Sequence, residues 1–138
     1  MLRIAVDFDG TIVEHAYPKI GKEKLFAFET LRELQKRGYL LILWTCRAGK
    51  ELDEAVEFCR KKGIEFYAVN KNHPDEEYLP GEIPRKIDAD IYIDDKNLGG
   101  LPTWSEIWQM IDPEGIYHGD AATTLKPSLL KRLFRKKQ

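Results

Sequence analysis

A short apolar run that ends abruptly in two acidic residues constrains this chain more than any other feature. The stretch reads Ile4-Ala5-Val6-Asp7-Phe8-Asp9-Gly10-Thr11. An uninterrupted apolar run is typical of a strand buried on both faces of a parallel sheet. The acids then follow the carboxyl end of the strand, where open α/β sheets bind ligands. In an extended chain Asp7 and Asp9 point to the same side, and two buried like charges need a cation beside them.

Two carboxylates at such a place can divide the work of phosphoryl transfer. Asp7 can be a nucleophile that forms an aspartyl-phosphate, and Asp9 can protonate the leaving oxygen and later activate water. The alternative is an acidic turn at a strand end, since Asp-Gly is a common turn pair. The pattern Asp-x-Asp-Gly-Thr after an apolar strand resembles motif I of the haloacid dehalogenase superfamily of phosphohydrolases.

The rest of the chain predicts alternating strands and helices. Expected strands cover about residues 2–7, 39–45, 65–69 and 90–94, and expected helices cover 23–37, 51–62 and 103–111. Successive βα units cross over right-handed and build a doubly wound sheet. We therefore predict an α/β fold, a doubly wound three-layer Rossmann-like fold with a mainly parallel sheet.

Two segments interrupt this alternation. Residues 12–22 contain Pro18 and Gly21 and indicate a loop or small flap over the site. Residues 70–85 contain three prolines and a glycine, which indicates a long ordered loop. Both segments are too short for a cap domain, so the chain is similar to small capless members of the superfamily.

Polar residues also follow the second and fourth predicted strands. Thr45 ends an apolar strand, and a hydroxyl there can donate to a phosphate oxygen; a threonine that caps a loop is the alternative. Its place resembles motif II of the superfamily. Asp94 and Asp95 follow Ile-Tyr-Ile, and two adjacent acids after a hydrophobic strand favour metal ligation. That pair resembles motif IV.

The resemblance implies a Mg²⁺ site, and Mg²⁺ suits hard oxygen ligands. Asp94 would bind the ion directly. Asp95 would bind it through water, or would hold the groups that bind the ion. Asp7 and the backbone carbonyl of Asp9 would supply the remaining protein ligands.

Motif III of the superfamily supplies a lysine that neutralises the phosphate. Lys86 is our choice because it precedes the fourth strand, and Arg85 and Lys71 are the alternatives. Each of these cations is equally well explained as a solvated surface residue. Further possible substrate contacts lie next to motifs I and II: Gly10, Thr11, Cys46 and Arg47.

Length and charge suggest one domain with an extension. Residues 1–111 form the predicted hydrolase core, and residues 112–138 form a C-terminal extension with a basic amphipathic helix at 128–137. Residues 126–138 hold six basic residues and no acid, which leaves 16 basic and 23 acidic residues, a net charge of −7, in the remainder. The tail is expected to dock on its own domain or on a second subunit; recruitment of an anionic partner is the alternative.

Composition indicates a soluble cytoplasmic protein. No apolar run approaches the length of a membrane span, and the chain begins with a strand rather than a signal peptide. Cys46 and Cys59 lack metal-ligand spacing and are expected to be reduced.

The leading hypothesis is a Mg²⁺-dependent phosphatase that hydrolyses a phosphomonoester through an aspartyl-phosphate. Asp9 disfavours dehalogenation, because expulsion of a halide needs no proton donor. The substrate would be a phosphorylated small molecule or the phosphorylated end of a macromolecule, and a homo-oligomer is possible. The alternative is a non-catalytic module on the same fold that binds or senses Mg²⁺ and phosphate.

Overall fold

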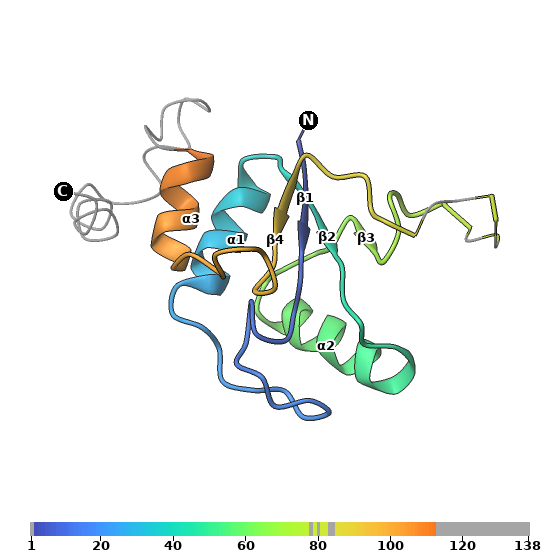
Figure 1. Ribbon diagram of the computed structural model, residues 1–138, viewed down its shortest axis with the longest axis horizontal. Helices are drawn as coiled ribbons and strands as arrows, with labels where there is room; N and C mark the ends of the chain where they lie inside the picture. Colours follow the sequence, from blue (N-terminus) through green and yellow to red (C-terminus); the bar gives the residue numbers. More distant parts are fainter. Residues whose placement is uncertain (1, 78, 80, 83–84, 113–138) are drawn as a thin grey trace.

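Four parallel strands form the centre of the computed structural model, which describes residues 2–77, 79, 81–82 and 85–112 (Figure 1). The strands are β1 (Arg3–Val6), β2 (Leu40–Leu43), β3 (Ala68–Val69) and β4 (Ile91–Ile93). Their order in the sheet is β3-β2-β1-β4, and every neighbouring pair is parallel. The chain therefore crosses back over β1 and β2 between β3 and β4, which makes β1 the strand next to the topological switch point.

The register of the sheet places the polar ends of its strands side by side. Val6 of β1 pairs with Leu43 of β2 and with Ile93 of β4. The next residue along β1 is Asp7, whose backbone N–H donates to the carbonyl of Ile93 at 3.0 Å. The polar segments that follow β1, β2 and β4 thus leave the sheet at the same edge.

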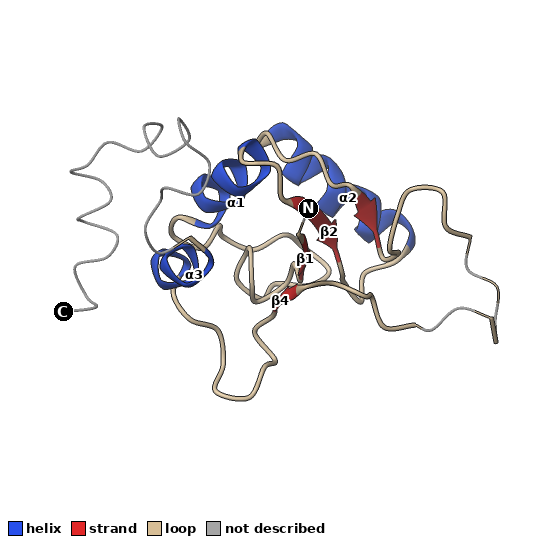
Figure 2. Ribbon diagram, turned by 90° about the horizontal axis from the view of Figure 1, so that it is seen from above, coloured by secondary structure: helices blue, strands red, loops and turns tan. Residues whose placement is uncertain are grey.

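Three helices cover one face of this sheet. They are α1 (Ala27–Lys36), α2 (Gly49–Lys61) and α3 (Trp104–Ile111). Apolar residues from all three helices join alternate strand residues in one core cluster, and Figure 2 shows the helices on the same side of the strands. This arrangement follows from the sequence, because each helix carries one apolar face.

The second face of the sheet is covered by the chain that connects β3 to β4. A smaller apolar cluster there joins Ala5, Ile42 and Ala68 of the strands to Ile87 of this connection. Within the described residues, loop therefore takes the place of helices in the third layer. The predicted α/β, Rossmann-like fold with a parallel sheet and no cap is confirmed. The loop predicted at residues 70–85 falls in the connection between β3 and β4.

Element boundaries differ from the predicted ones where tertiary contacts compete with the helix. Helix α1 begins at Ala27 rather than near residue 23, because Glu23 bridges to Val13 and Phe26 has a left-handed backbone. The strands are also shorter than predicted. Residues 113–138, including the predicted basic helix at 128–137, lie outside the described residues. Within the described part of the chain, no helix has the length and apolar character needed to cross a membrane.

Candidate active site

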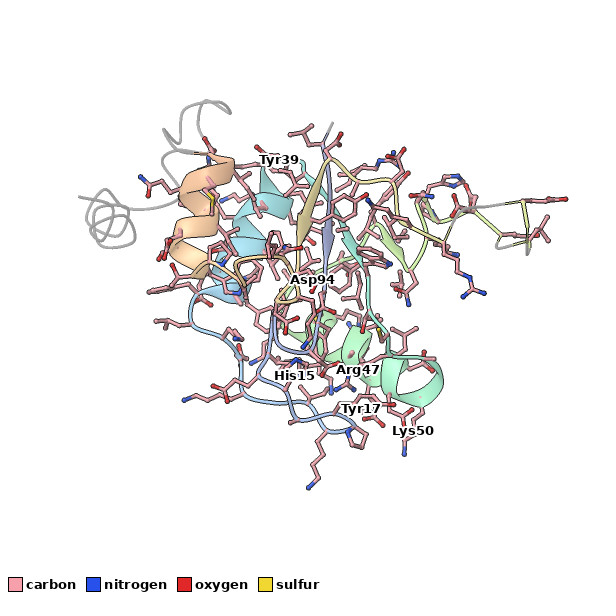
Figure 3. All side chains as sticks on the ribbon, in the orientation of Figure 1. His15, Tyr17, Tyr39, Arg47, Lys50 and Asp94 are labelled. Carbon is pink, nitrogen blue, oxygen red and sulfur yellow. The ribbon has the colours of Figure 1, made fainter. Side chains whose placement is uncertain are left out.

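The carboxyl ends of the strands surround a cavity of about 460 Å³. Its lining residues come from the segments after β1, β2 and β4: Asp7, Asp9, His15, Tyr17, Thr45, Cys46, Arg47, Asp94, Asp95 and Lys96. In Figure 3, His15, Tyr17, Arg47 and Asp94 gather at this end of the sheet, whereas Tyr39 lies at the opposite end. The structure thus brings together the acids and the threonine that the sequence singled out.

Three carboxylates form a compact cluster in this cavity. Asp7, Asp94 and Asp95 each offer a ligand atom, and these atoms lie within 4.8 Å of one another. Burial raises the pKa of Asp7 to about 7, and the negative charge of Asp94 adds to the shift. The cluster therefore carries more negative charge than its surroundings stabilise. Three hard carboxylate oxygens so close together could hold a divalent cation.

Asp95 has its own polar partners. Burial acts to raise the pKa of Asp95, but hydrogen bonds with His15 and Asp7 outweigh it and leave that pKa below its usual value. His15 Nε2 lies 3.1 Å from Asp95 Oδ2. Asp94, by contrast, accepts a hydrogen bond from the backbone N–H of Lys96 at 2.8 Å.

Thr11 joins the ends of β1 and β4 and is fully buried. Its hydroxyl donates to Asp7 Oδ2 at 3.0 Å and accepts from the backbone N–H of Asp95 at 3.0 Å. The indole N–H of Trp104 in α3 donates to the Thr11 carbonyl at 2.9 Å. Thr11 was predicted as a possible substrate contact; in the structure its side chain has no exposed surface and orients Asp7 and the Asp95 backbone.

Gly10 allows the acidic segments to approach one another. It is buried, its φ is +84°, and a Cβ there would lie 2.4 Å from Asp95 Oδ2 and 2.5 Å from His15 Nε2. The sequence suggested a substrate contact at this position. The structure gives Gly10 a different role, since the missing side chain is what leaves room for Asp95.

Asp9 pairs with Arg47 and is not part of the carboxylate cluster. Both of its carboxylate oxygens accept from Arg47, at 2.7 Å from Nε and 2.8 Å from Nη2. The Asp9 carboxylate is not one of the clustered ligand atoms. Metal binding through its backbone carbonyl stays a prediction. Arg47, which the sequence suggested as a possible substrate contact, binds a carboxylate of the protein itself.

Thr45 and Cys46 follow β2 and face the cavity. The backbone N–H of Thr45 donates to Asn70 Oδ1 at 2.8 Å, and the Thr45 hydroxyl oxygen accepts from the Arg47 N–H at 3.1 Å. The hydroxyl hydrogen can still donate to an anion in the cavity. Cys46 is exposed, which is compatible with a contact to substrate.

Lys86 does not line the cavity. It is exposed, and its ammonium lies 5.2 Å from the centre of the Tyr92 ring on the second face of the sheet. Neither Lys71 nor Arg85 lines the cavity. Lys86 precedes β4, and the residues before a strand lie away from the edge where its carboxyl end meets the cavity. Arg47 and Lys96 are the Lys and Arg side chains that line it among the described residues.

Sequence reasoning missed His15 and Lys96. Lys96 directly follows the Asp94-Asp95 pair, so its place beside these acids was available as a signal. His15 carries no such signal, because its contact with Asp95 depends on how residues 14–22 fold back. These residues, which we call the flap, return toward the site through a hydrogen bond from the Glu14 N–H to the Lys22 carbonyl at 2.8 Å.

Comparison with known proteins identifies a close structural relative. A solved structure, described as that of a conserved protein coded by a locus from Bacteroides thetaiotaomicron, is 54% identical in sequence. The match covers 82% of this chain and 91% of that chain, with a TM-score of 0.76. No family model and no curated protein matches the chain.

Proposed function

The chain belongs to the family of the conserved Bacteroides thetaiotaomicron protein, and we propose that it is a Mg²⁺-dependent phosphomonoesterase of the haloacid dehalogenase type. The observation that carries the proposal is the cavity itself. Asp7, Asp94 and Asp95 cluster within 4.8 Å, and Thr45 and Asp9 line the same cavity. This reaction needs a nucleophile, a pair of metal-binding acids, a hydrogen-bond donor to the phosphate and a second acid.

Asp7 acts as the nucleophile in this proposal. Its carboxylate attacks phosphorus, the bond from phosphorus to the ester oxygen breaks, and an aspartyl-phosphate forms. Thr11 holds the attacking group, because its hydroxyl donates to Asp7 Oδ2 at 3.0 Å. Thr45 donates to a phosphate oxygen from the neighbouring strand end.

Asp9 moves the proton. It gives its proton to the leaving alkoxide, and as a carboxylate it later takes a proton from the water that attacks phosphorus. The bond between phosphorus and Asp7 then breaks, and inorganic phosphate leaves. Asp9 differs from Asp7 in having a buried cation beside it, so the two acids have different surroundings.

The three clustered acids would hold the metal ion. Asp7 and Asp94 are the direct ligands in this proposal. Asp95 takes part through water and has His15 as its partner. When bound, Mg²⁺ supplies positive charge that offsets the charge on the phosphate. The raised pKa of Asp7 supports this assignment, since a cation would restore the ionised nucleophile.

Hydrolysis of a simple aryl phosphate tests the proposal. The wild-type protein should release phosphate with Mg²⁺ and lose that activity in a chelator, and Asp7→Asn should abolish turnover while the protein stays folded. Asp53→Asn is the matched control, because Asp53 is an exposed acid of α2 outside the cavity. Steady-state turnover by a folded Asp7→Asn protein would overturn the covalent mechanism.

A non-catalytic Mg²⁺ and phosphate-binding module is the alternative that the same experiment separates. Such a module would bind Mg²⁺ and inorganic phosphate in a calorimetric titration. It would release no phosphate from any ester in a panel of aryl, sugar and nucleotide phosphates. Phosphate release above the Asp7→Asn background would exclude it.

A further inference from the structure

Arg47 is a buried cation inside the candidate active site. Its side chain is 1% exposed although it lines the cavity. The guanidinium lies between two aromatic rings, 5.1 Å from the centre of Phe8 and 5.1 Å from that of Tyr17. Phe8 belongs to the segment after β1 and Tyr17 belongs to the flap, so Arg47 bridges two separate parts of the site.

Every N–H donor of this guanidinium has an acceptor. An arginine side chain carries five such donors. Two of them bind the carboxylate oxygens of Asp9, at 2.7 and 2.8 Å. The others bind backbone carbonyls of the flap and of α2: Pro18 at 3.2 Å, Lys19 at 2.8 Å and Glu51 at 3.3 Å.

A fully bonded guanidinium is not arranged to receive a phosphate. An Arg that binds substrate phosphate keeps donors pointing into the cavity, whereas those of Arg47 are used on Asp9 and on backbone carbonyls. The sequence suggested Arg47 as a substrate contact. Its geometry instead points to a role that is exercised through Asp9.

We propose that Arg47 is the positioning residue for Asp9, and that it fixes this carboxylate by tying it to the flap and to α2. The inference rests on the proposed phosphatase function and deepens it. The paired Asp9 carboxylate is kept apart from the three carboxylates of the metal cluster. Asp9 is thereby held at one place in the cavity that Asp7 also lines, and proton transfer to a leaving group requires such a fixed position.

Lysine cannot replace Arg47 in this role. A lysine ammonium has three donors on one atom, whereas the planar guanidinium binds both oxygens of a carboxylate and still reaches other acceptors. Arg47→Lys keeps the charge and loses this geometry. It therefore separates the contribution of the charge from that of the position.

Leaving-group dependence tests the proposal. Asp9 matters most for an alkyl phosphate, whose leaving oxygen needs a proton, and least for an activated aryl phosphate. Arg47→Met should lower kcat on the alkyl ester by about 10²-fold, the loss expected from a displacement on the order of 1 Å. It should change KM little and affect the aryl ester much less. The kcat of Arg47→Lys on the alkyl ester should lie between that of Arg47→Met and that of wild type.

A double variant shows whether the effect passes through Asp9. Asp9→Asn alone should lower kcat on the alkyl ester by about 10²–10⁴-fold. Adding Arg47→Met to this variant should lower kcat little further. Arg60→Met is the matched control and should behave as wild type. Arg60 is an exposed arginine of α2 that pairs with Glu57 outside the cavity.

Amide hydrogen exchange supplies a measurement that needs no enzyme activity. Arg47→Met should speed exchange in residues 14–22 and leave exchange in the strands unchanged. A rise in KM at constant kcat on both esters would show a phosphate contact and overturn the proposal. Equal loss on both esters with faster exchange throughout the protein would show a merely structural role. If wild type hydrolyses no ester, the proposed function fails, and unchanged exchange in residues 14–22 would overturn the tie to the flap independently.

Discussion

Asp7 and Asp9 are two residues apart and have opposite electrostatic surroundings. Asp7 shares its space with two other carboxylates, and burial among them raises its pKa to about 7. Asp9 faces the buried guanidinium of Arg47, whose own pKa is raised by the hydrogen bond to Asp9. The difference arises from neighbours on other strands, since the two acids have similar sequence contexts.

The raised pKa of Asp7 predicts how stability depends on pH in the metal-free protein. A folded-state pKa of about 7, above the ordinary value of 3.8, favours the folded state below pH 4. That contribution is lost as pH rises toward 7, because the ionised carboxylate is less stable in the fold than in the unfolded chain. Wild type in chelator should therefore lose more of its unfolding free energy between pH 4 and pH 7 than Asp7→Asn does.

Urea unfolding at several pH values measures this difference. Asp53→Asn should keep the wild-type pH profile, because Asp53 is exposed. Parallel profiles for wild type and Asp7→Asn would contradict the raised pKa.

Gly10→Ala should lower the free energy of unfolding by more than the backbone conformation of Gly10 alone explains. Gly10 and Gly38 both have positive φ, +84° and +94°, but a Cβ at Gly38 would meet no atom within 4 Å. Gly38→Ala should lose about 1–2 kcal/mol of unfolding free energy from backbone strain. Gly10→Ala should lose about 1–3 kcal/mol more, because its methyl group displaces Asp95.

Chemical denaturation of the two glycine variants gives the comparison. Gly10→Ala should in addition weaken Mg²⁺ binding, and Gly38→Ala should not. Equal stabilities of the two variants would show that Asp95 moves aside without cost.

Helix α3 supports the site from outside it. Its residue Trp104 holds the Thr11 carbonyl at 2.9 Å, and Thr11 in turn holds Asp7 and the Asp95 backbone. The helix is short, eight residues, so its first turn contributes a large share of its stability. Thr103 caps the N-terminus of this helix, since its side chain accepts from the Glu106 N–H at 3.2 Å.

Removal of this cap should loosen α3. Thr103→Ala should lower the free energy of unfolding by about 0.5–2 kcal/mol, because the Glu106 N–H loses its acceptor. Thr103→Ser keeps the hydroxyl and should stay within a few tenths of a kcal/mol of wild type. Thermal unfolding of both variants measures the effect, and an equal loss in both would assign it to the Thr103 methyl group instead.

The whole molecule combines an acidic cavity with a buried charge network elsewhere. Arg37, the residue that follows α1, pairs with Glu33 at 3.0 Å and with Asp112, and all three side chains are buried. Asp112 follows α3, so this network ties the last described residue to α1. The division of the chain at residues 111 and 112 stays a prediction.

Metal binding should stabilise the whole fold, because a ligand that binds the folded state raises the melting temperature. Mg²⁺ should raise Tm of wild type at pH 7. Asp94→Ala should reduce that rise more than Asp95→Ala, because the Asp95 carboxylate is already engaged by His15 and by the Thr11 hydroxyl. Asp53→Ala should respond as wild type does. Equal responses of the Asp94 and Asp95 variants would reject the assignment of Asp94 as the direct ligand.

The sequence by itself determined the alternation of strands and helices and the place of the acids. Apolar runs and amphipathic faces are local patterns, and they predict elements without knowledge of their neighbours. Because parallel strands end at one edge of a sheet, the positions of Asp7, Thr45 and Asp94 in the chain were sufficient to predict that they meet. The cavity brings them together.

Only the tertiary structure decided which side chains pair across the site. Arg47 and Asp9 are 38 residues apart, and Thr11 and Asp95 are 84 apart. Such pairs depend on how the flap and the loops fold back, and no local periodicity encodes that. The same reason explains why Lys86 was predicted at the cavity and lies beside Tyr92 instead. The position of a cation in the chain shows which strand it lies next to. Its contacts depend on the packing of the whole chain.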